Sequence, residues 1–234
     1  MATTAANRGI VRAIVISNLV SVILFGLRVV GTDRTDYWFM FWNLFLAWTP
    51  VLFAWLLVIK LKTQSWKEPM PVLLTALWLG FLPNSFYLMS DLIHLQETGD
   101  IGLMFDIVVF LSFIWNGLLA GFISLFMVHK QLLKHRTRDF ASWCIAGVLL
   151  LNSFALYLGR SLRWNTWDLL VSPAGLLFDV SERLIHPLSH PQVFVTTLTF
   201  FVLLGSMYMV IWNFAQVMTL NPSRRRYARK PKRK

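Results

Sequence analysis

Charged residues are scarce in this sequence. Asp, Glu, Lys and Arg make up 14% of its 234 residues, whereas hydrophobic residues make up 56%. A typical soluble domain contains about 25% charged and about 45–50% apolar residues. The mean hydropathy of +0.59 agrees with this difference. The shortage of charge therefore excludes an ordinary soluble domain and predicts a membrane protein.

Cysteine is almost absent as well. Cys144 is the single cysteine, so the chain cannot form an intrachain disulfide or a cysteine metal site. The sequence also lacks an HExxH-type motif and any cluster of histidine and cysteine. It therefore predicts no metal site, and it contains no motif that identifies a cofactor.

Long hydrophobic runs, by contrast, are abundant. A transmembrane helix needs about 20 apolar residues, whereas a spanning barrel needs short alternating segments. Six runs are long enough for helices, at about residues 13–30, 38–59, 72–89, 101–128, 140–158 and 193–217. We predict an all-α membrane protein, a six-transmembrane-helix bundle with a single polytopic domain over residues 1–222. No clear cleavage site follows Arg28, so the first helix is expected to stay uncleaved.

Basic residues are distributed unequally between the two sides of this bundle. Seventeen of the 22 Lys and Arg residues fall on the side that carries both ends of the chain, and four fall on the other. The positive-inside rule then predicts a cell-membrane protein with both termini cytoplasmic. The basic cytoplasmic tail, residues 223–234, directly follows a span. We interpret it as a topology signal or an anchor on anionic lipid, and not as a nucleic-acid site.

Acidic residues have the opposite distribution. Nine of the eleven lie on or near the predicted outer side. Charge in or near lipid usually faces a polar interior or a water-filled cavity. We therefore expect a polar site that faces outward.

The segment FLPNSFYLMSDLIHL, residues 81–95, brings polar residues to the outer end of the third run. Pro83 cannot donate the backbone hydrogen bond of a regular helix, so the helix is expected to kink or end near there. If helical geometry persists, Asn84 and Asp91 share a face, and His94 follows Asp91 at i+3. A carboxylate beside an imidazole suits general acid/base catalysis. The alternative is that Asp91 caps a helix and His94 sits among lipid headgroups.

A second polar segment, YLGRSLRWNTWDLL, follows the fifth run. In helical geometry one face would carry two guanidinium groups, two indoles and a carboxylate, from Arg160, Arg163, Trp164, Trp167 and Asp168. Arginine forks suit phosphate or carboxylate groups, and indoles suit a sugar, an acyl chain or the membrane interface. Two structural roles compete with binding: the tryptophans as an aromatic belt, and the arginines as snorkelling residues or partners of Asp168.

The segments NLFLAWTP, FLPNSFYLMSDLIHL and LGRSLRWNTWD together resemble the bacterial family of polytopic membrane proteins catalogued as domain of unknown function 1361. The resemblance extends from about Asn43 through the sixth run. It implies a multi-spanning protein of the cell envelope and carries no established activity. It places the family's polar signature at Asn84, Asp91, His94, Arg160, Arg163, Asn165 and Asp168. Ser85 and Phe86 depart from the family pattern, in which a small residue and a proline follow the asparagine.

Other polar residues are expected to support the fold. Asn43, Asn116 and Asn152 should form interhelical hydrogen bonds or mark kinks. Between the fifth and sixth runs, Ser172 can cap a helix that has Pro173 at its first position. An apolar stripe on that helix would consist of Leu176, Leu177, Val180 and Leu184. We expect an outer interfacial helix there.

Three functions fit these residues. In the first, Arg160 and Arg163 hold an anionic lipid headgroup or lipid-linked glycan, Asp91 and His94 act as an acid/base pair, and the tryptophans line the approach. The second is a small transporter or permease with a polar path through the bundle. The third is an assembly or regulatory subunit that binds another membrane protein. One cavity open to the outer leaflet favours the first, a path that reaches the basic side favours the second, and a flat polar surface favours the third.

The predicted topology can be tested by cysteine labelling in intact cells. On a Cys144→Ala background, Gln96→Cys and Ser161→Cys should react with an impermeant maleimide, because both lie on the predicted outer side. Ser223→Cys should react only after the cells are permeabilised. Labelling of Ser223→Cys in intact cells would reverse the assignment of the two sides.

Overall fold

The computed structural model describes residues 2–32, 35–95, 100–162, 164, 168–186 and 188–220. Every regular element within these residues is a helix, and six are long and apolar enough to cross a membrane, which confirms the predicted bundle. The elements are α1 (Ala2–Thr32), α2 (Phe39–Lys60), α3 (Pro69–Tyr87), the 3₁₀ helix η1 (Leu88–His94), α4 (Asp100–His135), α5 (Arg138–Ser161), α6 (Asp168–Val171), α7 (Pro173–Ile185) and α8 (Pro191–Leu220).

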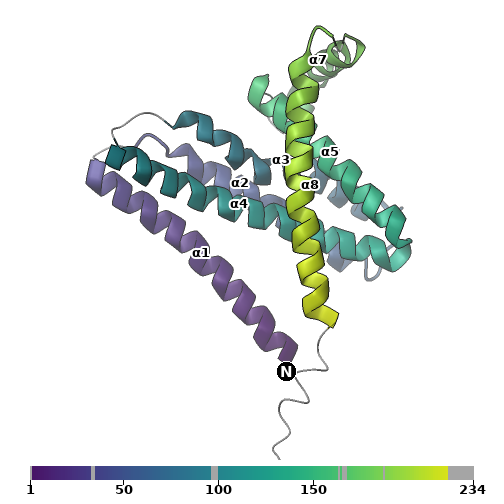
Figure 1. The fold of residues 1–234 in the computed structure, drawn as a ribbon. Helices are drawn as coiled ribbons and strands as arrows, with labels where there is room; N and C mark the ends of the chain where they lie inside the picture. Colours follow the sequence, from purple (N-terminus) through teal and green to yellow (C-terminus); the bar gives the residue numbers. More distant parts are fainter. Residues whose placement is uncertain are drawn as a thin grey trace, which may run out of the picture.

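Helix α4 is the centre of the bundle. It contacts α1, α2, α3, α5 and α8, and 61% of its most apolar stretch is buried. The corresponding stretches of α1 and α8 are 11% buried, and Figure 1 shows α1 along one side of the bundle and α8 in front of α4 and α5. In a bilayer, lipid would cover their exposed apolar faces.

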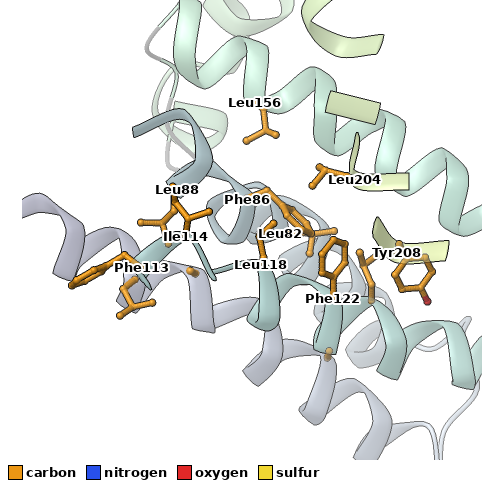
Figure 2. Close-up of a cluster of buried hydrophobic side chains, with 14 of the residues drawn as sticks. Leu82, Phe86, Leu88, Phe113, Ile114, Leu118, Phe122, Leu156, Leu204 and Tyr208 are labelled. Carbon is orange, nitrogen blue, oxygen red and sulfur yellow. The ribbon is translucent and has the colours of Figure 1, made fainter. Parts of the chain in front are cut away.

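Phe86 of α3 lies in the middle of the buried core. Figure 2 shows its ring close to Phe122 of α4 and Leu204 of α8. The ring centroids of Phe86 and Phe122 are 5.3 Å apart. A Cβ at Gly121 would come within 2.5 Å of Cζ of Phe86, so glycine makes room for this ring.

Gly117 sets the distance between α4 and the junction of α3 with η1. A Cβ at Gly117 would lie 2.6 Å from both Cδ1 of Leu88 and the carbonyl oxygen of Ser85. Small residues allow helix backbones to approach closely in membranes. The position of η1 therefore depends on having glycine, which has no side chain, at position 117.

The third helix does not end at Pro83. α3 continues through Pro83 to Tyr87, and η1 continues the winding with a tighter hydrogen-bond spacing. A proline removes one backbone donor, but the next turn is held from outside the helix. Oγ of Ser85 donates to the carbonyl oxygen of Ala47 in α2, over 2.7 Å. Packing against α2 and α4 thus outweighs the lost bond.

The predicted helix between the fifth and sixth spans is confirmed. α7 has Pro173 at its first position, but Ser172 forms no side-chain capping bond. Figure 1 shows α7 beyond the upper ends of α5 and α8. Of its predicted apolar stripe, Leu176 is partly buried and Leu177 is exposed.

Polar side chains join α1 to the rest of the bundle. Nδ2 of Asn116 donates to Oγ of Ser21 over 2.9 Å, and Nδ2 of Asn18 donates to Oδ1 of Asn116 over 3.1 Å. Nε1 of Trp48 in α2 donates to Oδ1 of Asn18 over 3.0 Å. The predicted interhelical role of Asn116 is confirmed, because it links α1 to α4.

A buried ion pair joins the same two helices near the other end of α1. Nε of Arg28 lies 2.6 Å from Oδ1 of Asp106, and their side chains are 1% and 2% exposed. The guanidinium also lies over the ring of Tyr37, 4.4 Å from its centroid. Asp106 therefore compensates the one arginine that the sequence places within the first span.

Removing one partner of this pair should destabilise the protein strongly. Asp106→Ala leaves buried Arg28 with only the long 4.0 Å contact to the half-exposed carboxylate of Asp36, so the free energy of unfolding should fall by about 3 kcal/mol. The double variant Arg28→Met, Asp106→Leu should recover most of that loss, because it buries no charge. Asp139→Ala, at an exposed position, is the control. Unfolding in detergent, followed by circular dichroism, measures all three, and equal losses in the single and double variants would contradict the assignment.

Candidate functional site

A pocket of about 390 Å³ lies where α3 passes into η1. Its sides come from α2, α3, η1 and α5, and α7 reaches it through Leu176. This is the end of the bundle that the sequence predicts to face outward. The pocket brings together elements that lie far apart along the chain.

Asp91 forms the buried polar part of the pocket. Its side chain is 1% exposed, and Nδ2 of Asn43 donates to its Oδ2 over 2.9 Å. This bond joins η1 to α2, which confirms the interhelical role predicted for Asn43. A carboxylate can accept several hydrogen bonds, so Asp91 can also receive one from a hydroxyl or ammonium group of a ligand.

His94 lies at the rim of the pocket, beside Arg160. Nη1 of Arg160, in the last turn of α5, is 3.5 Å from Nε2 of His94. A guanidinium can only donate, so Nε2 is the acceptor in this contact. The ring of Phe39 meets the imidazole edge to face, with centroids 5.2 Å apart. Arg160 has further N–H donors, and an anion at the rim can bind them.

Asp91 and His94 both line the pocket without bonding to each other. Within the described residues, no hydrogen bond joins the two side chains, and the polar neighbour of His94 is Arg160. The acid/base roles of Asp91 and His94 therefore stay predictions. Nowhere among the described residues do three His, Cys, Asp or Glu side chains gather closely enough to hold a metal ion.

Aromatic residues form the wall on the α2 side. Phe39, Trp42 and Asn43 line the pocket with spacings of three and four residues, so they share one face of α2. The side chain of Trp42 is 55% exposed, and it stacks on Phe45 with centroids 5.5 Å apart. Since α2 is long and apolar enough to span a membrane, lipid would contact this exposed surface in a bilayer. The pocket therefore borders a lipid-facing aromatic surface.

The segment after α5 does not continue as one helix, contrary to the prediction. α5 ends at Ser161, and the amide of Trp164 donates back to the carbonyl oxygen of Leu158 over 3.4 Å. Asp168 begins the separate helix α6. Arg160, Trp164 and Asp168 therefore do not share one helical face, because the chain turns back over the end of α5.

Gly159 lies where the returning chain and Tyr87 both approach α5 closely. A Cβ there would lie 3.1 Å from Cε2 of Tyr87 and 3.4 Å from the carbonyl oxygen of Trp164. The absence of a side chain lets α3 and the returning chain close over the end of α5. As a result, Trp164 lines the pocket that Tyr87 and Gly159 also line.

Helix α7 is fastened to the pocket through Trp164. Nε1 of Trp164 donates to Oδ2 of Asp179 over 2.8 Å, and Nη1 of Arg183 lies 3.3 Å from Oδ1 of the same carboxylate. Burial lowers the pKa of Arg183. The hydrogen bond with Tyr157 and the negative charge of Asp179 together raise this pKa by more than burial lowers it, so the pKa lies above its ordinary value. These contacts hold Leu176 over the pocket.

The structure gathers much of the site that the sequence predicts. Four predicted residues line the pocket: Asn84, Asp91, His94 and Trp164. Arg160 joins them through His94, whereas Asp168 is not among the lining residues. Three predicted residues lie outside the described part of the chain: Arg163, Asn165 and Trp167.

Sequence reasoning missed the α2 wall and the contribution of α7. Phe39 and Trp42 belong to the second apolar run, residues 38–59, which contains no charged residue, and Leu176 was expected only in an apolar stripe. The spacing from Phe39 to Asn43 could have shown that these residues share a face. No sequence pattern shows that this face meets Asp91, which is 48 residues away from Asn43.

Comparison with known proteins gives one match. A family model described as "Protein of unknown function (DUF1361)" matches residues 42–206. No curated protein and no solved structure matches the chain. The matched segment contains every residue that lines the pocket except Phe39.

The attachment of α7 gives a testable prediction. Asp179→Ala removes the acceptor of Trp164 and the partner of Arg183, so α7 should separate from the pocket more often. Amide exchange across residues 173–185, measured by mass spectrometry in detergent, should become about tenfold faster. Glu182→Ala is the control, because Glu182 is more exposed and its contact with His190 is 3.9 Å long. Unchanged exchange in Asp179→Ala would mean that other contacts hold α7.

Proposed function

The chain belongs to the DUF1361 family of proteins of unknown function, and from its six long apolar helices and its pocket we propose that it is a membrane protein that binds an amphiphile by an anionic headgroup. The binding site in this proposal is the pocket between α2, α3, η1 and α5. An anionic lipid and a lipid-linked glycan both have the required chemistry. The predicted orientation puts this site in the outer leaflet.

One observation carries the proposal: the pocket borders both an exposed aromatic surface on α2 and a cationic rim at Arg160, and these two surfaces meet where Phe39 packs against His94. Phe39 and Trp42 are exposed on α2, and Arg160 meets His94 at the rim. An amphiphile needs both kinds of surface, because its headgroup is charged and its chains are apolar. A soluble anion would need only the rim.

The side chains have separate roles in this proposal. Arg160 binds the anionic group with parallel N–H donors, and His94 adds a ring nitrogen beside it. Asp91, held by Asn43, accepts a hydrogen bond from a hydroxyl or ammonium group of the same headgroup. Trp42 and Phe39 contact the first part of the acyl or isoprenoid chain.

The pocket also supports processing of the headgroup as an extension of binding. His94 is exposed at the rim, where an imidazole can transfer a proton to or from a bound molecule. Asp91 lies deeper and can accept one from a hydroxyl. Binding alone is the minimal proposal, and a reaction would require both side chains to reach the same bound molecule.

Arg160→Gln tests the proposal. Wild-type protein purified in mild detergent should retain anionic amphiphiles above their proportion in the source membrane, measured by mass spectrometry of extracted lipids. Arg160→Gln should lose most of this enrichment. Its thermal stability should change little, because the contact of Arg160 with His94 is long and such partly exposed contacts contribute about 0–1 kcal/mol.

Arg136→Gln is the matched control, because Arg136 is exposed and lies outside the pocket. Equal loss of lipid in both variants would show a general charge effect and would contradict the proposal. If the purified wild-type protein retains another membrane protein and no enriched lipid, the assembly-subunit alternative would be favoured. Uptake of a small solute that depends on Arg160 would favour the transporter.

A further inference from the structure

Asp91 is a buried carboxylate without an ion-pair partner. Its side chain is 1% exposed, and the hydrogen bond that it accepts comes from the neutral amide of Asn43. Among the residues that the structure describes, no lysine, arginine or histidine forms an ion pair with it. Asp106, which is buried to the same extent, pairs with Arg28 over 2.6 Å. Buried charges are normally paired in this way, so Asp91 has a place for a cation.

The pocket gives Asp91 access to such a cation. Asp91 is among the residues that line it. Asn152 provides a contrast, because within the described residues its amide atoms lack the predicted interhelical hydrogen bond. Asn152 is not a lining residue, so a molecule in the pocket does not reach it. Of these two buried polar side chains, Asp91 is therefore the one that a ligand can satisfy.

The pocket has a positive group at its rim and a negative group below it. His94 is exposed beside Arg160, whereas Asp91 is buried. Asp91 and His94 both belong to the 3₁₀ helix η1, in which three residues complete a turn with a rise of about 2 Å per residue. Asp91 therefore lies on the same side of η1 as His94, about 6 Å farther from the rim. Arg160 attracts this carboxylate without forming an ion pair with it.

The other lining residues suit an organic cation. Phe39, Trp42, Tyr87 and Trp164 all line the pocket, and aromatic faces attract ammonium groups. A divalent metal ion needs several carboxylate or imidazole ligands. No group of three such side chains gathers anywhere among the described residues. A primary ammonium group needs one carboxylate and can donate a hydrogen bond to it.

We propose that the headgroup bound in the pocket carries a primary ammonium group, which pairs with Asp91 while the anionic group of the same headgroup binds Arg160. This inference rests on the function proposed above and names the class of headgroup. A phosphate and an ammonium group separated by two carbons fit the step of one 3₁₀ turn between the two levels. Asp91 is then the residue that determines specificity, because it favours this headgroup over one with the same phosphate and no amine.

Two kinds of amphiphile have this chemistry. One is a phospholipid with an amino alcohol in its headgroup, and the other is a lipid-linked glycan with an amino sugar next to its phosphate. Mass spectrometry of the lipids that the purified protein retains distinguishes these two sources. In both cases the enriched lipid should contain a primary amine, and enrichment of lipids without an amine would contradict the inference.

Stability of the delipidated protein is the first direct test. Asp91→Asn keeps the size of the side chain and an oxygen that accepts the bond from Asn43, but it removes the charge. Its melting temperature in a non-ionic detergent should be at least that of the wild type. Asp106→Asn is the matched control, because it removes the charge of a carboxylate that is paired with Arg28, and its melting temperature should fall. A similar fall in Asp91→Asn would show that Asp91 is paired within the protein and would overturn the inference.

Binding is the second test, with the delipidated full chain in the same detergent. The probes are dihexanoyl phosphatidylethanolamine and dihexanoyl phosphatidylethanol, which differ by one amino group. Isothermal titration calorimetry should show that the wild type binds the amine about tenfold more tightly, because a charge-assisted hydrogen bond adds to its affinity. Asp91→Asn should bind the amine more weakly and phosphatidylethanol at least as tightly as the wild type does. A misfolded variant would lose both lipids, so this unequal response reports the charge of Asp91.

Two further variants separate the inference from the proposed function. Arg160→Gln should weaken the binding of both probes, whereas Asp139→Asn, at an exposed position, should bind them as the wild type does. If binding depends on Arg160 but the amine adds nothing, or adds the same in Asp91→Asn, the inference is wrong and the proposed function stands. If neither probe binds, or Arg160→Gln binds both as the wild type does, both proposals are wrong.

Discussion

The bundle depends on one constraint: in a bilayer, apolar side chains gain little by leaving lipid for one another. Helices in such a medium associate through close packing and through polar groups that need partners. α1 shows this plainly, because most of its apolar surface faces outward, and its contacts with α4 include Asn116, Asn18 and the buried pair Arg28 and Asp106. Polar contacts decide which face of each peripheral helix turns inward.

The pocket follows from the same constraint applied at one end of the bundle. Ser85 at the end of α3 donates a hydrogen bond to α2, and Gly117 lets α4 approach the same end of α3 closely. The end of α3 is therefore held on two sides. In η1, Asp91 accepts a hydrogen bond from Asn43 and His94 lies beside Arg160. The chain after α5 turns back over Gly159, and α7 attaches through Trp164 and Asp179. Polar groups that need partners in lipid are thereby concentrated around one hollow.

The spans and the outer helix could be predicted because each depends on residues that are neighbours in sequence. Runs of apolar residues determine where a helix can cross, and Pro173 marks the start of α7. The residues at which the third helix becomes a 3₁₀ helix and the fifth helix ends could not be predicted, for a common reason. Beyond Pro83, Ser85 bonds to α2, and beyond Ser161 the chain turns back close to Gly159 and Tyr87. Both outcomes depend on partners from other helices, which local sequence does not reveal. The pairing of Asn43 with Asp91 is hidden for the same reason.

Gly117 has a consequence for how this family can vary. Leu88, which its missing side chain accommodates, is the first residue of η1, and Asp91 follows one turn later. A methyl group at Gly117 would push on the backbone that carries Asp91 and His94, although Gly117 itself touches neither. Two relatives could therefore keep an identical set of polar residues around the pocket and still differ in its shape. The difference would come from the distance between α4 and the junction of α3 with η1.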